Sequence, residues 1–172
     1  YKNNDFNGIF RYLTSGTGVN IHDNGTVNIS SNSINEERHH PKNLVDYHKD
    51  NYFLSLDNGD AKIYFDFKDK SIQLSSYSIK SYRSPKDLSG HLRSWVIEAS
   101  NDGFNWQIID RHDDDPSLNE NGVTANFRVQ KQTDNFYRFI QLRQTGPNWH
   151  RVTSNYLLFN LIEFYGKLKI LF

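Results

Sequence analysis

Hydrophobic and polar residues alternate along several short segments of the chain. In the segments 63–67, 95–99, 125–129 and 157–161 every second residue is apolar. A period of two residues is typical of a β-strand that turns one face toward a hydrophobic core. The segments 73–82 and 136–143 predict two further strands.

The remaining segments favour turns over helices. Residues 18–21 and 26–29 flank Asp23-Asn24-Gly25, a sequence that favours a hairpin turn. No segment of 12 or more residues keeps a helical period, and we expect one helical turn, at 43–47 after Pro41. Many short strands with turn-rich connections predict one all-β domain, a sandwich or a barrel, rather than βαβ units.

Composition narrows the class of protein. The chain has 172 residues, 25 of them Phe, Tyr or Trp, so it can bury a core as a single domain. Its 20 basic and 20 acidic residues balance, which argues against a chain-wide attraction to nucleic acid or to an anionic membrane. The absence of Cys excludes disulfides and thiolate metal sites. The chain starts at Tyr1 and contains no Met, so we expect a piece of a longer protein.

Several phrases of the sequence resemble one known family. Residues 94–103, Ser-Trp-Val-Ile-Glu-Ala-Ser-Asn-Asp-Gly, followed by Trp106, resemble the W-x-x-E-x-S-N-D-G-x-x-W phrase of the discoidin, or coagulation-factor type C, family. Segments 41–46, 63–68, 136–142 and 161–166 resemble further phrases of that family in the same order. The resemblance covers residues 8–168 and implies an all-β, eight-stranded jelly-roll sandwich of the galactose-binding-like class. Residues 169–172 would form a tail that leads to the rest of the protein.

The resemblance also suggests a cellular setting. Segments 90–95 and 142–148 are similar to phrases in discoidin domains of intracellular ubiquitin-ligase and BTB adaptor proteins. Secreted members usually join their chain ends by a disulfide, which a chain without Cys cannot form. We therefore expect a cytoplasmic location.

Catalytic chemistry has little support in the sequence. The 7 His residues belong to no zincin helix and to no Ser/His/Asp motif. Asp113, Asp114 and Asp115 precede Pro116, as in a solvated turn, and this reading is favoured over a cluster for acid/base chemistry or metal. We expect a domain that is not an enzyme and that needs no cofactor, calcium being the one metal to be weighed.

Calcium is suggested by the resemblance alone. Many glycan-binding members hold a structural Ca²⁺ near an Asp-Gly turn, and the matching residues here are Asp46 and Glu163, with Asp50 nearby. Calcium requires six or more oxygen ligands. Tyr47 replaces the usual Gly, which weakens the match. The alternative is that Asp46 caps the turn and that Glu163 pairs with a neighbouring donor.

Loops at one end of the sandwich hold the ligand in members of the family. Here these loops would be 35–41, 82–93 and 146–155, and they also contain His39 and Lys86. The side chains that we single out for ligand or partner binding are Arg38, His40, Arg83, His91, Arg93, Asn148, Trp149, His150 and Arg151. Trp149 stands in a polar loop, where it could anchor a protein interface or stack on a sugar ring. The alternative is that Trp149 folds back and only fills the end of the core.

The sequence thus predicts a non-catalytic recognition module of a larger intracellular protein. Its partner would be a protein or peptide bound through the loops, in an adaptor or scaffold role. The alternative is a carbohydrate-binding, lectin-like module, for which neutral charge and a loop aromatic are suitable. Attachment to a membrane ranks last, because Trp149 is the one aromatic residue suited to insertion and the net charge is zero.

Overall fold

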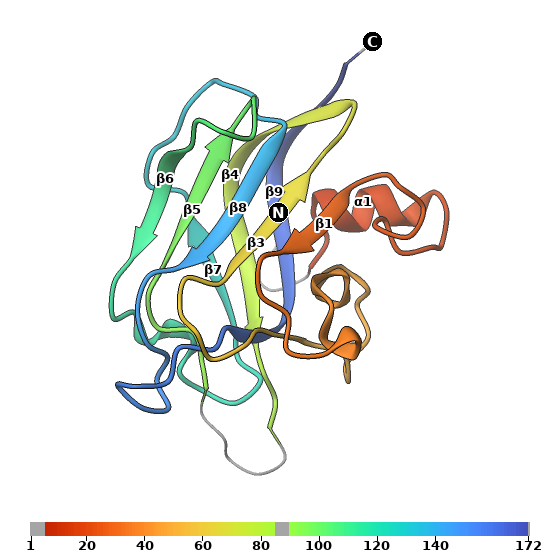
Figure 1. The fold of residues 1–172 in the computed structure, drawn as a ribbon. Coiled ribbons are helices and arrows are strands. Elements are labelled where there is room, and N and C mark those ends of the chain that lie inside the picture. Colours follow the sequence, from red (N-terminus) through yellow and green to blue (C-terminus); the bar gives the residue numbers. More distant parts are fainter. Residues whose placement is uncertain (1–5, 85–89, 172) are drawn as a thin grey trace.

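The computed structural model describes residues 6–84 and 90–171, which form a sandwich of two antiparallel sheets (Figure 1). The five-stranded sheet has the order β1 (Asn28–Ser31), β3 (Lys62–Asp66), β8 (Phe139–Gln144), β5 (Trp95–Ser100) and β6 (Gln107–His112). The four-stranded sheet has the order β2 (Phe53–Leu54), β9 (Leu158–Ile170), β4 (Lys70–Ser81) and β7 (Thr124–Arg128). The predicted all-β sandwich is confirmed. The described residues hold nine strands because the two-residue β2 is added beside β9.

The helices are short. They are α1 (Ile9–Ser15) and three 3₁₀ turns, η1 (Glu37–His39), η2 (Pro41–Val45) and η3 (Pro116–Leu118). The helical turn expected after Pro41 corresponds to η2, whereas α1 was not predicted. Its seven residues are too few to show a helical period, and its position depends on Phe10, whose ring packs against Phe65 and Phe164 at centroid distances of 5.4 and 4.8 Å. Within the described residues no helix is long and apolar enough to cross a membrane.

The core lies between the two sheets and is filled by the inward residues of the alternating strands. Trp95, Phe65 and Phe159 are fully buried, as the alternation predicts. Two aromatic residues that we would also expect in the core lie elsewhere. Trp106 and Phe139 are half-buried on the outer face of the five-stranded sheet, with ring centroids 6.5 Å apart.

The predicted hairpin at residues 18–29 is wrong. Asn20 uses its side chain to accept from the His22 backbone N–H and to donate to the Lys42 carbonyl, so this segment folds into turns. The strand that follows, β1, pairs with β3 instead. At the other terminus β9 continues to Ile170, so residues 169–170 of the expected tail belong to a strand, and Phe172 lies outside the described residues.

One end of the sandwich carries the long connections. The β4–β5, β6–β7 and β8–β9 connections lie there with the β2–β3 connection and the 3₁₀ turns η1 and η2, at the lower end of Figure 1. We call this the loop end. It contains most of the residues that the sequence singles out, and rigid strands hold its loops in place.

Candidate binding site at the loop end

Trp149 joins three connections of the loop end. Its indole Nε1 donates to the Asp115 carbonyl at 3.2 Å, and its backbone N–H donates to the His91 carbonyl at 3.0 Å. The Arg93 guanidinium lies 4.6 Å from the centroid of its ring and also pairs with Asp114 at 2.6 Å. Trp149 is half-buried, and its indole N–H has a hydrogen-bond partner. These contacts give Trp149 a structural role, which is to hold the three connections together.

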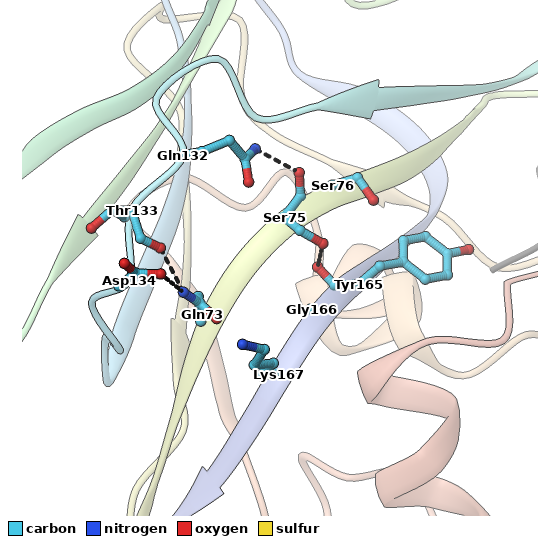
Figure 2. Close-up of a pocket in the computed structure, with 9 residues that line it drawn as sticks. All are labelled: Gln73, Ser75, Ser76, Gln132, Thr133, Asp134, Tyr165, Gly166 and Lys167. Atoms are coloured by element: carbon cyan, nitrogen blue, oxygen red, sulfur yellow. Dashed lines mark hydrogen bonds between the residues drawn. The ribbon is translucent and has the colours of Figure 1, made fainter.

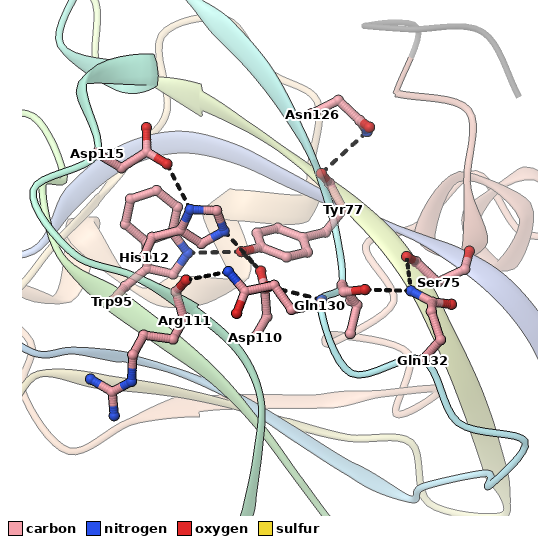
Figure 3. A network of polar contacts seen from close by, with 11 residues as sticks. Ser75, Tyr77, Trp95, Asp110, Arg111, His112, Asp115, Asn126, Gln130 and Gln132 are labelled. Carbon is pink, nitrogen blue, oxygen red and sulfur yellow. Dashed lines mark hydrogen bonds and ion pairs between the residues drawn. The ribbon is translucent and has the colours of Figure 1, made fainter.

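Polar contacts continue from Asp115 into the core (Figure 3). His112 lies between two carboxylates, with its Nδ1 2.6 Å from Asp115 and its Nε2 2.9 Å from Asp110. Tyr77 donates to Asp110 at 2.6 Å and accepts from the Trp95 indole at 2.9 Å. Burial lowers the pKa of His112, but the hydrogen bonds and charges of the two carboxylates outweigh burial and leave this pKa above its usual value.

Other predicted residues shape the loop between β8 and β9. Asn148 is buried, its Oδ1 accepting from the His150 N–H at 3.0 Å and its Nδ2 donating to the Tyr156 carbonyl at 3.0 Å. His91 is buried as well, and burial lowers the pKa of its imidazole against the opposing effect of hydrogen bonds. Arg151 is exposed. The amide of Asn148 is thus engaged within the loop.

The remaining predicted residues lie on other segments. Arg38 is exposed and pairs with Glu36 at 2.8 Å. His40 accepts from the Lys42 backbone N–H at 3.1 Å and so caps η2. Arg83 is exposed beyond β4, and Lys86 lies outside the described residues. Within residues 6–84 and 90–171, contacts bring Arg93, His91 and Trp149 together but do not join Arg38 or His40 to them.

A pocket that the sequence analysis missed lies at the same end, on the four-stranded sheet. It has a volume of about 340 Å³, and its walls are the half-buried rings of Tyr52, Tyr82 and Tyr156 with Leu54 and Leu158. The polar lining residues are Asn35, Ser55 and Asp57. We call this cavity the tyrosine pocket. Its volume lies within the usual range for small-ligand sites, about 300–1,000 Å³.

Contacts outside the cavity fix the positions of the three tyrosines. The rings of Tyr52 and Tyr82 are 4.7 Å apart, and the Tyr52 hydroxyl lies 3.0 Å from Nε2 of the buried His39. Tyr156 packs directly over Gly90, where an added Cβ would lie 2.2 Å from its ring. Burial raises the pKa of Tyr156, and the nearby charge of Asp57 raises it further. These rings come from three distant segments, so no local sequence pattern could have indicated the pocket.

The residues suggested for calcium do not form a cation site. Glu163 is fully buried, and its carboxylate accepts from the backbone N–H groups of Phe10 and Arg11 at 2.8 and 3.1 Å and from the Tyr47 hydroxyl at 2.7 Å. Burial raises the pKa of Glu163 even against these hydrogen bonds. Donors therefore surround the oxygens that a cation would need, and the residues present do not fit calcium.

The turn at Asp46 has a similar explanation. Asp46 accepts from the His48 N–H at 2.8 Å and from the Asn51 side chain at 2.6 Å, and Asp50 is exposed. Among the described residues no group of three or more His, Asp or Glu side chains could hold a metal ion. The alternative reading of these residues, a turn cap and a buried acceptor, is the one that the geometry supports.

A larger cavity of about 750 Å³ lies away from the loop end, beside the bulge of β4 and β9 (Figure 2). Its polar side chains are used within the protein. Gln73 donates to the Thr133 carbonyl at 2.7 Å, Gln132 donates to the Ser75 carbonyl at 3.1 Å, and the Ser75 hydroxyl donates to the Tyr165 carbonyl at 2.9 Å. This cavity offers a ligand fewer free groups than its size suggests.

Comparison with known proteins finds relatives that match part of the sequence and solved structures that share the fold. No family model matches the chain. This chain is 34% identical, over 103 residues or 56% of its length, to the E3 ubiquitin-protein ligase Ufd4 of Drosophila melanogaster. It is 33% identical over 91 residues, 53% of its length, to the E3 ubiquitin-protein ligase hecd-1 of Caenorhabditis elegans. These matches span only 4% and 3% of the lengths of the two ligases.

Solved structures with the same fold include carbohydrate-binding modules. One from Clostridium perfringens, in complex with GalNAc-β-1,3-galactose, has a TM-score of 0.63 at 11% identity, covering 83% of this chain and 96% of its own. A family 32 module of the same organism, in complex with galactose, has a TM-score of 0.61 at 12% identity, covering 84% and 95%. At such identities the similarity shows the fold alone, a galactose-binding-like β-sandwich.

Proposed function

We propose that the chain is a non-catalytic recognition domain that holds its ligand in the tyrosine pocket at the loop end. The observation that carries this proposal is the pocket itself, in which Tyr52, Tyr82 and Tyr156 enclose an apolar cavity on a rigid strand end. Aromatic rings with a few polar groups are the usual lining of a ligand site. The discoidin subgroup, suggested by the sequence phrases, is part of the same proposal.

The proposed setting is a longer protein of the ubiquitin-ligase kind. The partial similarity to Ufd4 and hecd-1 supports this setting. In such a protein a non-catalytic domain would recruit a substrate or join an assembly while chemistry takes place elsewhere. A cytoplasmic location is part of this proposal.

We favour a peptide segment of a partner protein as the ligand. The pocket is more apolar than polar, and the Ser55 hydroxyl in its lining is already engaged, since it donates to the Leu56 carbonyl and accepts from the Leu157 N–H. Each sugar hydroxyl that is buried in such a lining without a partner costs about 1–3 kcal/mol.

A glycan is the second candidate. It is supported by the solved structures, two of which are complexes with galactose-containing sugars, and the similarity of fold therefore favours a glycan over a peptide. The lining of the pocket favours the peptide, so the two ligand classes must be compared in one experiment.

That experiment exposes the domain to a randomised peptide library and to a glycan panel in parallel. Tyr82→Ala removes one wall of the pocket, and Phe104→Ala is the matched control, because Phe104 is 88% exposed in the turn between β5 and β6, at the opposite end. We expect peptides that bind wild type and Phe104→Ala but not Tyr82→Ala, with unchanged circular dichroism. Glycans with that dependence would promote the second candidate, and ligands indifferent to Tyr82 would refute the site.

A further inference from the structure

The tyrosine pocket combines three aromatic rings with one carboxylate. Asp57 is the only charged side chain among the described residues that line it. A cation near aromatic faces is stabilised by about 0.5–1 kcal/mol at exposed sites and by about 2 kcal/mol where it is desolvated. We propose that the pocket takes the side chain of a lysine or arginine from a peptide ligand, an inference that rests on the proposed function.

The shape of such a side chain matches the lining. A lysine or arginine has an apolar stem and a charged end, and the stem can be buried while the head stays near water. Leu54 and Leu158 offer an apolar wall for the stem. Asp57 is exposed, and its Oδ1 accepts from the Asn155 N–H at 2.6 Å, so Oδ2 remains for the cation.

Four cations of the described residues lie over aromatic rings outside the pocket. Within the described residues Arg11 lies 3.7 Å from the centroid of Tyr47, and Arg93 lies 4.6 Å from that of Trp149. Arg138 and Lys169 lie over Phe139 and Phe136. In that part of the chain no such pair involves Tyr52, Tyr82 or Tyr156, so none of these four cations occupies the pocket.

Arg151 is one cation near the pocket that could oppose a charged ligand. It is exposed on the β8–β9 connection, and it acts on Tyr156 in the opposite sense to Asp57. At the Tyr156 hydroxyl the influence of the Asp57 carboxylate is the larger of the two. At this wall of the pocket the effect of Asp57 is therefore not cancelled by that of Arg151.

The test separates charge from shape. Isotope-labelled domain is titrated with Ac-Gly-Arg-Gly-NH₂ and Ac-Gly-Lys-Gly-NH₂, and with the neutral analogues that carry citrulline and norleucine, while amide signals around the tyrosine pocket are followed by NMR. We expect the cationic peptides to bind about 2- to 30-fold more tightly than their neutral analogues, the range that corresponds to one cation–aromatic contact.

Two variants assign this preference to the pocket. Asp57→Asn keeps an oxygen for the Asn155 N–H and should reduce the preference for charge, leaving the part that the rings supply. Asp60→Asn makes the same charge change in the same connection, at an exposed residue that does not line the tyrosine pocket, and should preserve the whole preference. A preference that is undiminished in Asp57→Asn would overturn the inference.

The remaining outcomes are also decisive. Equal binding of the neutral analogues, no signal change at the pocket, or preferential binding of galactose or glucosamine would each overturn the cationic side chain as the occupant. Peptides that depend on Tyr82 but not on charge would leave the proposed function standing. If no peptide and no glycan depends on Tyr82, the proposed function itself fails.

Discussion

The surroundings of Glu163 show how one neighbouring residue can change what a carboxylate binds. The discoidin resemblance pairs this glutamate with an Asp-Gly turn and a calcium ion, but the chain has Tyr47 in place of the glycine. Tyr47 adopts a φ of 59°, the left-handed conformation that glycine normally supplies, and its hydroxyl lies 2.7 Å from the Glu163 carboxylate. The tyrosine keeps the backbone turn and replaces the cation with a hydrogen-bond donor.

We expect Tyr47→Phe to destabilise the domain by about 1–3 kcal/mol, because a buried charged acceptor loses a donor. Urea denaturation followed by tryptophan fluorescence measures this loss. Neither calcium nor a chelator should change the midpoint of wild type. A rise of the midpoint with added calcium would contradict this reading of Glu163.

At the scale of elements, β6 connects the core to the loop end. His112 ends this strand and stacks on the core residue Trp95 at a centroid distance of 4.4 Å. Its two carboxylate partners stand on either side, Asp110 within β6 and Asp115 at the start of η3. The charge of the His112 imidazole therefore affects the stability both of β6 and of the connection that supports Trp149.

The contribution of His112 should depend on pH in a defined sense. The pKa of His112 is raised in the folded state. Its contribution to the free energy of unfolding is therefore complete below 6.5, its pKa in the unfolded state, and is lost as pH rises through the pKa of the folded state. The free energy of unfolding of His112→Gln should lie about 1–3 kcal/mol below that of wild type at pH 6, and this gap should narrow with rising pH.

The measurement is a series of urea denaturations of both proteins across this pH range. The difference in the free energy of unfolding between wild type and His112→Gln is the quantity to compare. The pKa values of four other histidines are lowered, mainly by burial, so these residues make both proteins more stable as pH rises; they are His22, His39, His40 and His91. A gap that stays constant would show that the charge of His112 plays no part.

Trp149 belongs to the same scale, since it links three connections. We expect Trp149→Ala to lower the free energy of unfolding by about 1–3 kcal/mol, less than the 3–5 kcal/mol of a fully buried tryptophan. Arg151→Ala, an exposed change two residues along the same loop, should stay within about 0.5 kcal/mol of wild type. Thermal unfolding that is unchanged by Trp149→Ala would contradict this structural role.

At the scale of the whole molecule, the sequence predicts what depends on local pattern. The alternation in 63–67, 95–99 and 125–129 predicts strands, and these are present as β3, β5 and β7. The seven-residue α1 was missed because its place is set by the packing of Phe10 on both sheets. The short alternation at 18–21 predicts a strand, but the side-chain contacts of Asn20 hold that segment in turns.

The candidate site divides in the same way. Arg93 and Trp149 could be placed at the loop end from the order of the strands, because each follows or precedes a predictable one. The tyrosine pocket could not, since Tyr52, Tyr82 and Tyr156 meet only when β2, β4 and β9 lie side by side. Positions on one strand follow from its pattern, whereas positions across strands require the pairing of the sheet.

The hydroxyl of Tyr47 has a consequence for the way in which the fold is maintained. A bound ion stabilises a protein by mass action, so its effect rises and falls with the concentration of the free ion. A hydroxyl on the same chain has an effective concentration that is fixed by the fold and cannot be diluted or chelated away. We therefore expect the stabilisation that the contact between Tyr47 and Glu163 provides to be independent of the concentration of free calcium.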